Sequence, residues 1–167
     1  MNKVVFTLCV FVVVLIGCTS SKPIESFLLS EGNQLYYLRS TNLNGKGVSV
    51  LVDFTYNTTK GKDVICNFTV ESSDLNTNKV SALEFVVNGI KDTAITFSVN
   101  TLFKDENITR FTSLLSKSDF QKMVECLSVS ECSSVISIRI EKQVFVLKRS
   151  ASFIKAMKSA NKILPWE

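Results

Sequence analysis

Several segments before residue 104 alternate between apolar and polar residues, which is the pattern of a half-buried β-strand. The segments with this period of two are residues 48–56, 64–72, 80–89 and 93–103, and residues 33–40 begin the ordered part of the chain. The residues expected on their apolar faces are Val48, Val50, Val52, Phe54 and Tyr56, then Leu83, Phe85 and Val87, and then Ile95, Phe97 and Val99. Turns rich in Gly, Asn and Asp separate the segments, at residues 42–47, 57–63, 73–79 and 88–92. Short alternating runs joined by such turns predict an antiparallel β-sheet or a sandwich.

The hydrophobic period changes from two to 3.6 in the C-terminal half. In residues 116–127 the apolar positions follow helical spacing, and Ser118 with Gln121 fits a capping box. Residues 107–115, which come before it, are expected to be a helical turn or an approach loop. Residues 134–140 and 143–148 flank Glu141–Lys142 as a predicted hairpin.

Residues 150–164 predict a second, amphipathic helix that Pro165 ends. Its apolar stripe consists of Phe153, Met157, Ala160 and Leu164, and its lysines are Lys155, Lys158 and Lys162. The stripe is expected to dock on the sheet. The lysines are expected to form a solvated face, and the alternative is a face that lies on anionic lipid. The predicted fold class is therefore α+β, an antiparallel sheet or sandwich with two or more helices in the C-terminal half.

The N-terminus has the pattern of an export signal. Lys3 precedes an apolar run at residues 4–16, which is shorter than the ~20 residues that a membrane-spanning helix needs. The run ends in Leu15-Ile16-Gly17-Cys18, which resembles the lipobox of bacterial lipoproteins. The resemblance implies cleavage between Gly17 and Cys18 and a diacylglycerol on the Cys18 thiol. An ordinary signal peptide cut after Ser20 is the alternative.

The lipobox resemblance divides the chain into three parts. Residues 1–17 are the expected signal peptide, residues 18–23 a lipidated tether and residues 24–167 a single globular domain, a length that is sufficient for one core. Two acyl chains hold a protein stably at a bilayer. The expected location is the cell envelope, where membrane lipid is the partner of the acylated Cys18. Thr19 after the cysteine implies the outer membrane, if the organism has one.

Three cysteines remain once Cys9 leaves with the signal peptide and Cys18 takes the lipid. Cys126 and Cys132 are close in sequence, and an exported protein permits a disulfide between them. Cys66 shares an apolar strand face with Val64, Phe68 and Val70, so we expect a buried free thiol.

The chain contains no histidine, which excludes Ser-His-Asp and Cys-His nucleophile systems and removes the commonest metal ligand. Two S-x-x-K matches, Ser152–Lys155 and Ser159–Lys162, lack the companion motifs of a Ser-Lys enzyme. The carboxylates that a glycosidase would have to bring together are spread over strands and turns, at Asp53, Asp63, Asp74, Glu84 and Asp92. The sequence predicts no catalytic residue, no metal and no cofactor.

The net charge of +4 is too small and too scattered to indicate a nucleic-acid partner. The N-x-T sequons at Asn57, Asn67 and Asn107 would mark glycosylation in a eukaryotic secreted protein; in a bacterial chain they reflect an Asn- and Thr-rich composition. The first hypothesis is a lipid-anchored, non-catalytic envelope domain that binds another protein or a surface component. The alternatives are a small envelope enzyme that uses carboxylate or lysine chemistry, and an inhibitor or exclusion lipoprotein that inserts the polar loop at residues 57–63 into a partner.

Overall fold

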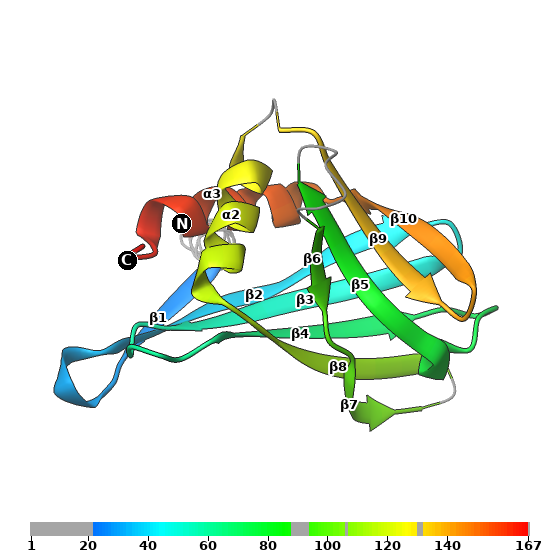
Figure 1. The fold of residues 1–167 in the computed structure, drawn as a ribbon, viewed down its shortest axis with the longest axis horizontal. Coiled ribbons are helices and arrows are strands. Elements are labelled where there is room, and N and C mark those ends of the chain that lie inside the picture. Colours follow the sequence, from blue (N-terminus) through cyan, green and yellow to red (C-terminus); the bar gives the residue numbers. More distant parts are fainter. Residues whose placement is uncertain (1–21, 88–93, 106, 130–131, 167) are drawn as a thin grey trace, which may run out of the picture.

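The computed structural model describes residues 22–87, 94–105, 107–129 and 132–166. The lipobox-like residues at positions 15–18, including the predicted cleavage and lipidation sites, lie outside these ranges, as does Asp92. In Figure 1 the described chain forms a curled sheet with two helices at one end.

The strands, in chain order, are β1 (Ile24–Leu28), β2 (Gln34–Gly45), β3 (Val48–Asn57), β4 (Val64–Glu71), β5 (Val80–Val87), β6 (Ala94–Phe97), β7 (Asn100–Lys104), β8 (Ile108–Leu115), β9 (Ser134–Ile140) and β10 (Gln143–Arg149). The helices are α2 (Lys117–Ser128) and α3 (Ala151–Ile163), with two short 3-10 helices, η1 (Ser30–Gly32) and η2 (Thr77–Lys79). Both α-helices lie in the C-terminal half, as predicted.

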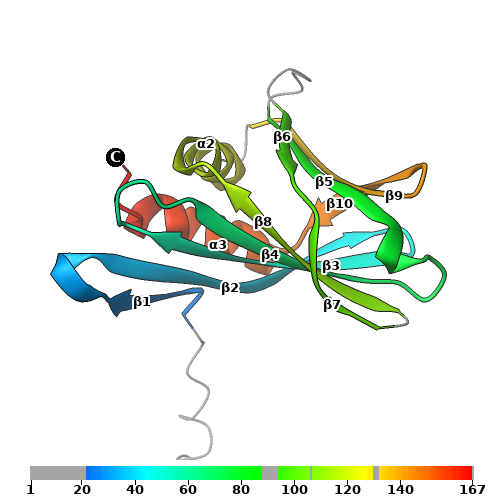
Figure 2. The ribbon, with the colours of Figure 1, turned by 60° about the horizontal axis from the view of Figure 1, so that its bottom comes forward.

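All of these strands belong to one antiparallel sheet, and the α+β class is confirmed at that level. The order across the sheet is β6-β5-β9-β10-β2-β3-β4-β8-β7, and β1 pairs with the first part of β2. The strands β2, β3, β4 and β8 form one half of the sheet, which we call the first half. The strands β5, β9 and β10 form the second half, which Figure 2 shows at a steep angle to the first.

The sheet curls until its two ends nearly meet. The end strands β6 and β7 follow each other in the chain, and only Ser98 and Val99 separate them. The hydroxyl of Ser98 also lies 3.2 Å from that of Ser113 in β8, so the ends are held together by a side-chain hydrogen bond. The sheet is therefore a half-barrel with a concave interior.

The predicted alternating faces line this interior. Val48, Val50, Val52, Phe54 and Tyr56 of β3 are each 5 % exposed or less. The other expected interior residues that the structure shows to be buried are Val64, Cys66, Phe68, Val70, Leu83, Phe85, Ile95 and Phe97. The side chain of Val87 is outside the described part, and Val99 packs against the core from its edge.

The two helices close the open side of the half-barrel. Four apolar residues of α2 are buried at helical spacing, namely Phe120, Met123, Val124 and Leu127. Helix α3 packs against α2 and against β2 and β1, and the side chains of its apolar stripe, Phe153, Met157, Ala160 and Leu164, are almost fully buried. The docking that the sequence predicts for this stripe is confirmed.

The prediction for residues 107–115 was wrong, because residues 108–115 form β8 and pair with β4 along its whole length. Two interior positions of β8 are polar, which hides the alternation from a sequence reading. Thr109 and Ser113 are both fully buried, and each hydroxyl has a hydrogen-bond partner. The Thr109 hydroxyl lies 2.8 Å from that of Thr77, and the Ser113 hydroxyl pairs with that of Ser98.

The capping box predicted at Ser118 and Gln121 was also wrong. The cap of α2 is Ser116, whose Oγ accepts a hydrogen bond from the backbone N–H of Asp119 at 3.1 Å. The chain leaves β8 at Leu115, so Ser116 is the first residue that is free to cap the helix.

Three other parts of the sheet also differ from the prediction. Residues 42–45 continue β2 and leave only Lys46–Gly47 as the turn, where Gly47 has the positive φ of +73° that favours glycine. The segment at residues 93–103 is divided into β6 and β7. The strand β1 was not predicted at all. The hairpin around Glu141–Lys142 is confirmed.

The docking of α3 predicts a clear stability difference between two substitutions in the same helix. Phe153→Ala removes a fully buried ring and leaves a cavity, so we expect a loss of about 3 kcal/mol or more in unfolding free energy. The control Ile163→Ala, at a side chain that is 52 % exposed, should lose less than about 1 kcal/mol. Urea unfolding measures both, and equal losses would contradict the docking.

Candidate functional site

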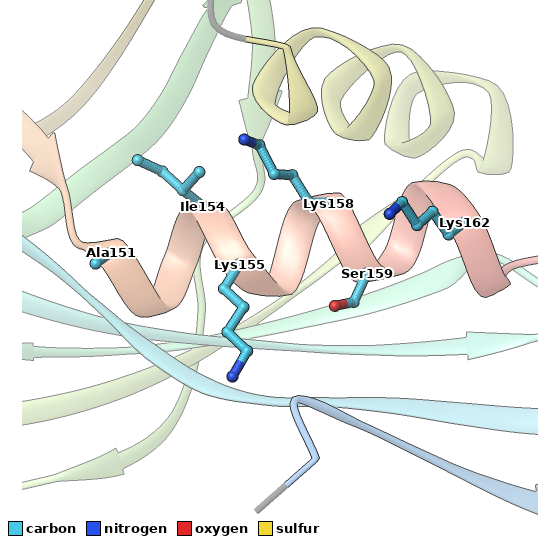
Figure 3. Close-up of a pocket in the computed structure, with 6 residues that line it drawn as sticks. All are labelled: Ala151, Ile154, Lys155, Lys158, Ser159 and Lys162. Atoms are coloured by element: carbon cyan, nitrogen blue, oxygen red, sulfur yellow. The ribbon is translucent and has the colours of Figure 1, made fainter. Parts of the chain in front are cut away.

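Helix α3 presents a continuous basic face to solvent. Its N-cap is Ser150, whose Oγ accepts from the backbone N–H of Phe153 at 3.1 Å and sets where the helix begins. The residues that point away from the core recur every three or four positions. They are Ala151, Ile154, Lys155, Lys158, Ser159 and Lys162, and we call them the α3 lysine face. They line a shallow depression of about 450 Å³. Figure 3 shows how their side chains are arranged along the helix.

The charge on this face is not neutralised within the described part of the chain. The side chains of Lys155, Lys158 and Lys162 are exposed, and none of them takes part in an ion pair there. The helix itself contains no Asp or Glu. Three cations on one rigid helix face therefore attract anions without competition from an acidic neighbour on α3.

A second hollow, of about 460 Å³, adjoins the C-terminal end of the same helix. Its lining combines β1 with α3 and consists of Lys22, Ile24, Glu25, Ser26, Phe27, Tyr36 and Ile163. Lys22 is the first described residue, so the chain enters the domain beside α3. Phe27 and Ile163 are about half exposed, and Glu25 is paired with Arg39 across β1 and β2. We call this hollow the entry hollow.

The outer face of the first half carries a polar cluster around Asp53. The Asp53 side chain is only 1 % exposed, and its Oδ2 accepts from Arg110 Nη2 at 2.8 Å. Asn67 Nδ2 donates to Oδ1 at 3.0 Å, and Ser40 Oγ donates to Oδ2 at 3.3 Å. These residues come from four adjacent strands, so the cluster ties the first half of the sheet together. Both carboxylate oxygens are engaged, which suits a structural role better than proton transfer.

The other predicted carboxylates occupy separate elements. Asp63 lies in the β3–β4 loop, Asp74 lies in the β4–β5 connection, and Glu84 in β5 faces Arg139 with an N···O distance of 3.6 Å. Both S-x-x-K matches fall on α3. In one of them, Ser159 and Lys162 belong to the α3 lysine face. In the other, the hydroxyl of Ser152 lies 2.9 Å from that of the N-cap Ser150.

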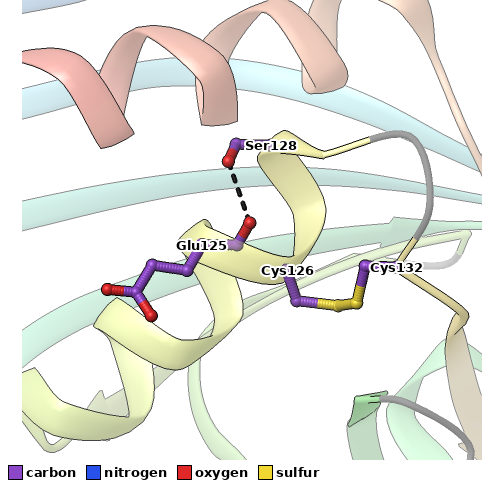
Figure 4. Close-up of a disulfide and its surroundings, with 4 residues drawn as sticks. All are labelled: Glu125, Cys126, Ser128 and Cys132. Carbon is purple, nitrogen blue, oxygen red and sulfur yellow. Dashed lines mark hydrogen bonds between the residues drawn. A yellow bond between two sulfur atoms is a disulfide. The ribbon is translucent and has the colours of Figure 1, made fainter.

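The structure joins Cys126 and Cys132 by a disulfide, the pairing that the sequence favoured (Figure 4). The bond links the last turn of α2 to the segment before β9. Ser128 Oγ donates to the carbonyl of Glu125 at 2.9 Å in the same turn. Cys66 is free and fully buried, as predicted. Burial raises the pKa of its thiol well above the ordinary value, and the Asp53 carboxylate raises this pKa further.

The polar loop at residues 57–63 is exposed at its tip and braced at its base. Its Thr58 exchanges hydrogen bonds with Gln34 of β2, at 2.9 Å and 2.7 Å. Lys117 Nζ of α2 donates to the carbonyls of Thr58 and Thr59. At Gly61 the backbone takes a φ of +73°. The loop thus has a fixed conformation, but its chemistry does not identify a ligand.

No helix among the described residues is both long and apolar enough to cross a bilayer. They contain no cluster of three or more His, Cys, Asp or Glu side chains that could hold a metal ion. Comparison of the chain with protein-family models, with curated proteins and with solved structures found no significant match.

The sequence located the lysines of α3 but missed two features of the surface. It placed Asp53 within the alternating segment at residues 48–56 without showing that Arg110 and Asn67 would enclose it, because that requires the pairing of β3, β4 and β8. It also did not indicate that Lys22 and Ile163 would line one hollow, since β1 was not predicted.

The Asp53 cluster predicts unequal effects for two arginine substitutions. Arg110→Ala leaves the buried Asp53 carboxylate without its cationic donor, so we expect a loss of about 2 kcal/mol in unfolding free energy. Arg139→Ala breaks a longer and more exposed pair and should lose less than about 1 kcal/mol. Urea unfolding tests this, and a loss for Arg110→Ala no larger than that for Arg139→Ala would rule out the structural role.

The burial of Cys66 predicts an unreactive thiol. Because a raised pKa and exclusion from solvent both keep the thiolate scarce, iodoacetamide at pH 8 should leave Cys66 unmodified in the native mature protein. In guanidinium without reductant, peptide mapping should find Cys66 alkylated and Cys126 still linked to Cys132. Rapid native alkylation of Cys66, or a disulfide that includes it, would contradict the assignment.

Proposed function

We propose that the chain is a lipid-anchored lipoprotein of the bacterial cell envelope, whose domain is a non-catalytic binding module. The observation that carries this proposal is the junction between the lipobox-like sequence and the fold. Only residues 19–23 separate Cys18 from Ile24, the first residue of β1. An apolar run, a Gly-Cys pair and a short polar tether thus stand directly before a packed domain, an arrangement that suits lipid anchoring.

The short tether has a physical consequence for such a lipoprotein. A chain extends at most about 3.6 Å per residue, so Ile24 would lie within about 20 Å of the acylated Cys18. The domain would then ride close to the bilayer and meet its partner there. An outer-membrane location, expected from Thr19, belongs to this proposal.

The assignment to binding rather than catalysis is supported by the chemistry of the chain. No histidine is available as a general base, and Asp53, the most deeply buried of the predicted carboxylates that the structure describes, is held by three donor residues. A partner in the envelope, either a protein or a surface component, is the proposed ligand of the domain.

The anchor can be tested with two cysteine variants of the full-length protein in a bacterial host fed a clickable fatty acid. Cys18→Ala should abolish incorporation of the label and leave an uncleaved or soluble form, because the only predicted acceptor thiol is gone. The matched control Cys9→Ala, within the expected signal peptide, should keep both labelling and cleavage. A wild-type protein without label, or a Cys18→Ala protein that keeps it, would overturn the proposal.

A further inference from the structure

We propose that the α3 lysine face lies on the anionic phospholipid surface of the bilayer in which Cys18 is anchored. This inference rests on the proposed lipid anchor and adds the orientation of the domain. The face is a preformed surface, since Phe153 and Met157 fix the helix to the core from the opposite side. No unfolding or release of α3 is needed to present the lysines.

Charge complementarity gives the first argument. Lys155, Lys158 and Lys162 project from one side of a helix that carries no acidic residue, and they form no ion pair within the described part of the chain. Flexible, strongly hydrated ammonium groups suit diffuse attraction to a layer of phosphates better than one fixed ligand. The shallow, open shape of the depression also fits a flat surface better than a small molecule.

The position where the chain enters the domain gives the second argument. Lys22 and Ile163 line the same entry hollow, and Ile163 follows Lys162 directly. The residues that lead back to Cys18 therefore begin at the C-terminal end of the lysine face. Because the tether reaches at most about 20 Å, it confines this side of the domain to the anchoring bilayer rather than to another anionic surface.

The rim of the entry hollow gives the third argument. Phe27 is 49 % exposed and Ile163 is 52 % exposed, and Leu28, next to Phe27, is 77 % exposed. Aromatic and aliphatic side chains beside lysines are the composition of surfaces that rest in a lipid interface. The apolar residues would contact the interface while the lysines meet the phosphates.

The inference can be tested by measuring lysine acetylation rates on the mature lipoprotein in vesicles. Flotation with zwitterionic phosphatidylcholine vesicles first establishes the anchor. On vesicles that also contain phosphatidylglycerol, Lys155, Lys158 and Lys162 should react about fivefold more slowly than on zwitterionic ones, the factor that corresponds to ~1 kcal/mol per basic residue. Lys46 and Lys142, in the β2–β3 and β9–β10 turns, should react equally on both. The protection should vanish in 1 M salt, where the Debye length is about 3 Å.

A pair of double variants separates this orientation from general attraction. In K155E/K158E the remaining Lys162 should lose its protection, because the face is now repelled. In K46E/K142E, which changes the net charge equally, Lys162 should stay protected. Both variants alter exposed side chains and should keep the wild-type melting temperature.

The outcomes distinguish the two proposals. A protein that does not float with zwitterionic vesicles lacks the anchor, and both proposals then fail. A floated protein whose Lys162 reacts equally on both kinds of vesicle, or is protected no more than Lys46 and Lys142, keeps the anchor but overturns the orientation.

Discussion

The contact between Phe120 of α2 and the aromatic residues of β3 is the interaction on which the rest of the architecture depends. The ring of Phe120 lies 5.1 Å from Phe54 and 6.3 Å from Tyr56, centroid to centroid, deep in the half-barrel. Trp166 packs on both Tyr56 and Phe120, and the Tyr56 hydroxyl donates to the carbonyl of Pro165 at 2.9 Å. One aromatic cluster thus fixes both helix α2 and the segment at Pro165 and Trp166 against the sheet. Helix α3 packs against both α2 and β2 through its buried stripe, and its lysines are exposed on the other side.

This arrangement gives the sheet and helix α3 separate roles. The sheet supplies a rigid frame, which the Asp53 cluster ties across four strands on the outside and the apolar interior holds from the inside. Helix α3 supplies a charged surface, and the packing of α3 on β1 and β2 fixes its position relative to the entering chain. A short tether and a rigid face are together what an oriented, membrane-bound module requires. A long tether would leave any such face free to turn away from the bilayer.

The sequence predicted those elements whose buried positions are apolar without interruption. The alternation from Val48 to Tyr56 located β3, and the helical stripe of α3 identified the side that docks. Prediction failed where long-range contacts make polar residues acceptable inside. Thr109 and Ser113 lie in the core only because Thr77 and Ser98, distant in sequence, supply their hydrogen bonds. The curl of the sheet and the enclosure of Asp53 depend on strand pairing in the same way, and neither can be read from a local pattern.

Both the membrane location and the orientation of the domain depend on acylation of Cys18. Intact mass spectrometry of the protein extracted from bacterial envelopes tests this acylation directly. A lipid-anchored protein should give a chain that begins at Cys18 and carries the added mass of a diacylglyceryl group, with or without a third acyl chain on the new amino group. A mature chain that begins at Ser21 and has no added mass would contradict it, because an ordinary signal peptidase would then have removed Cys18.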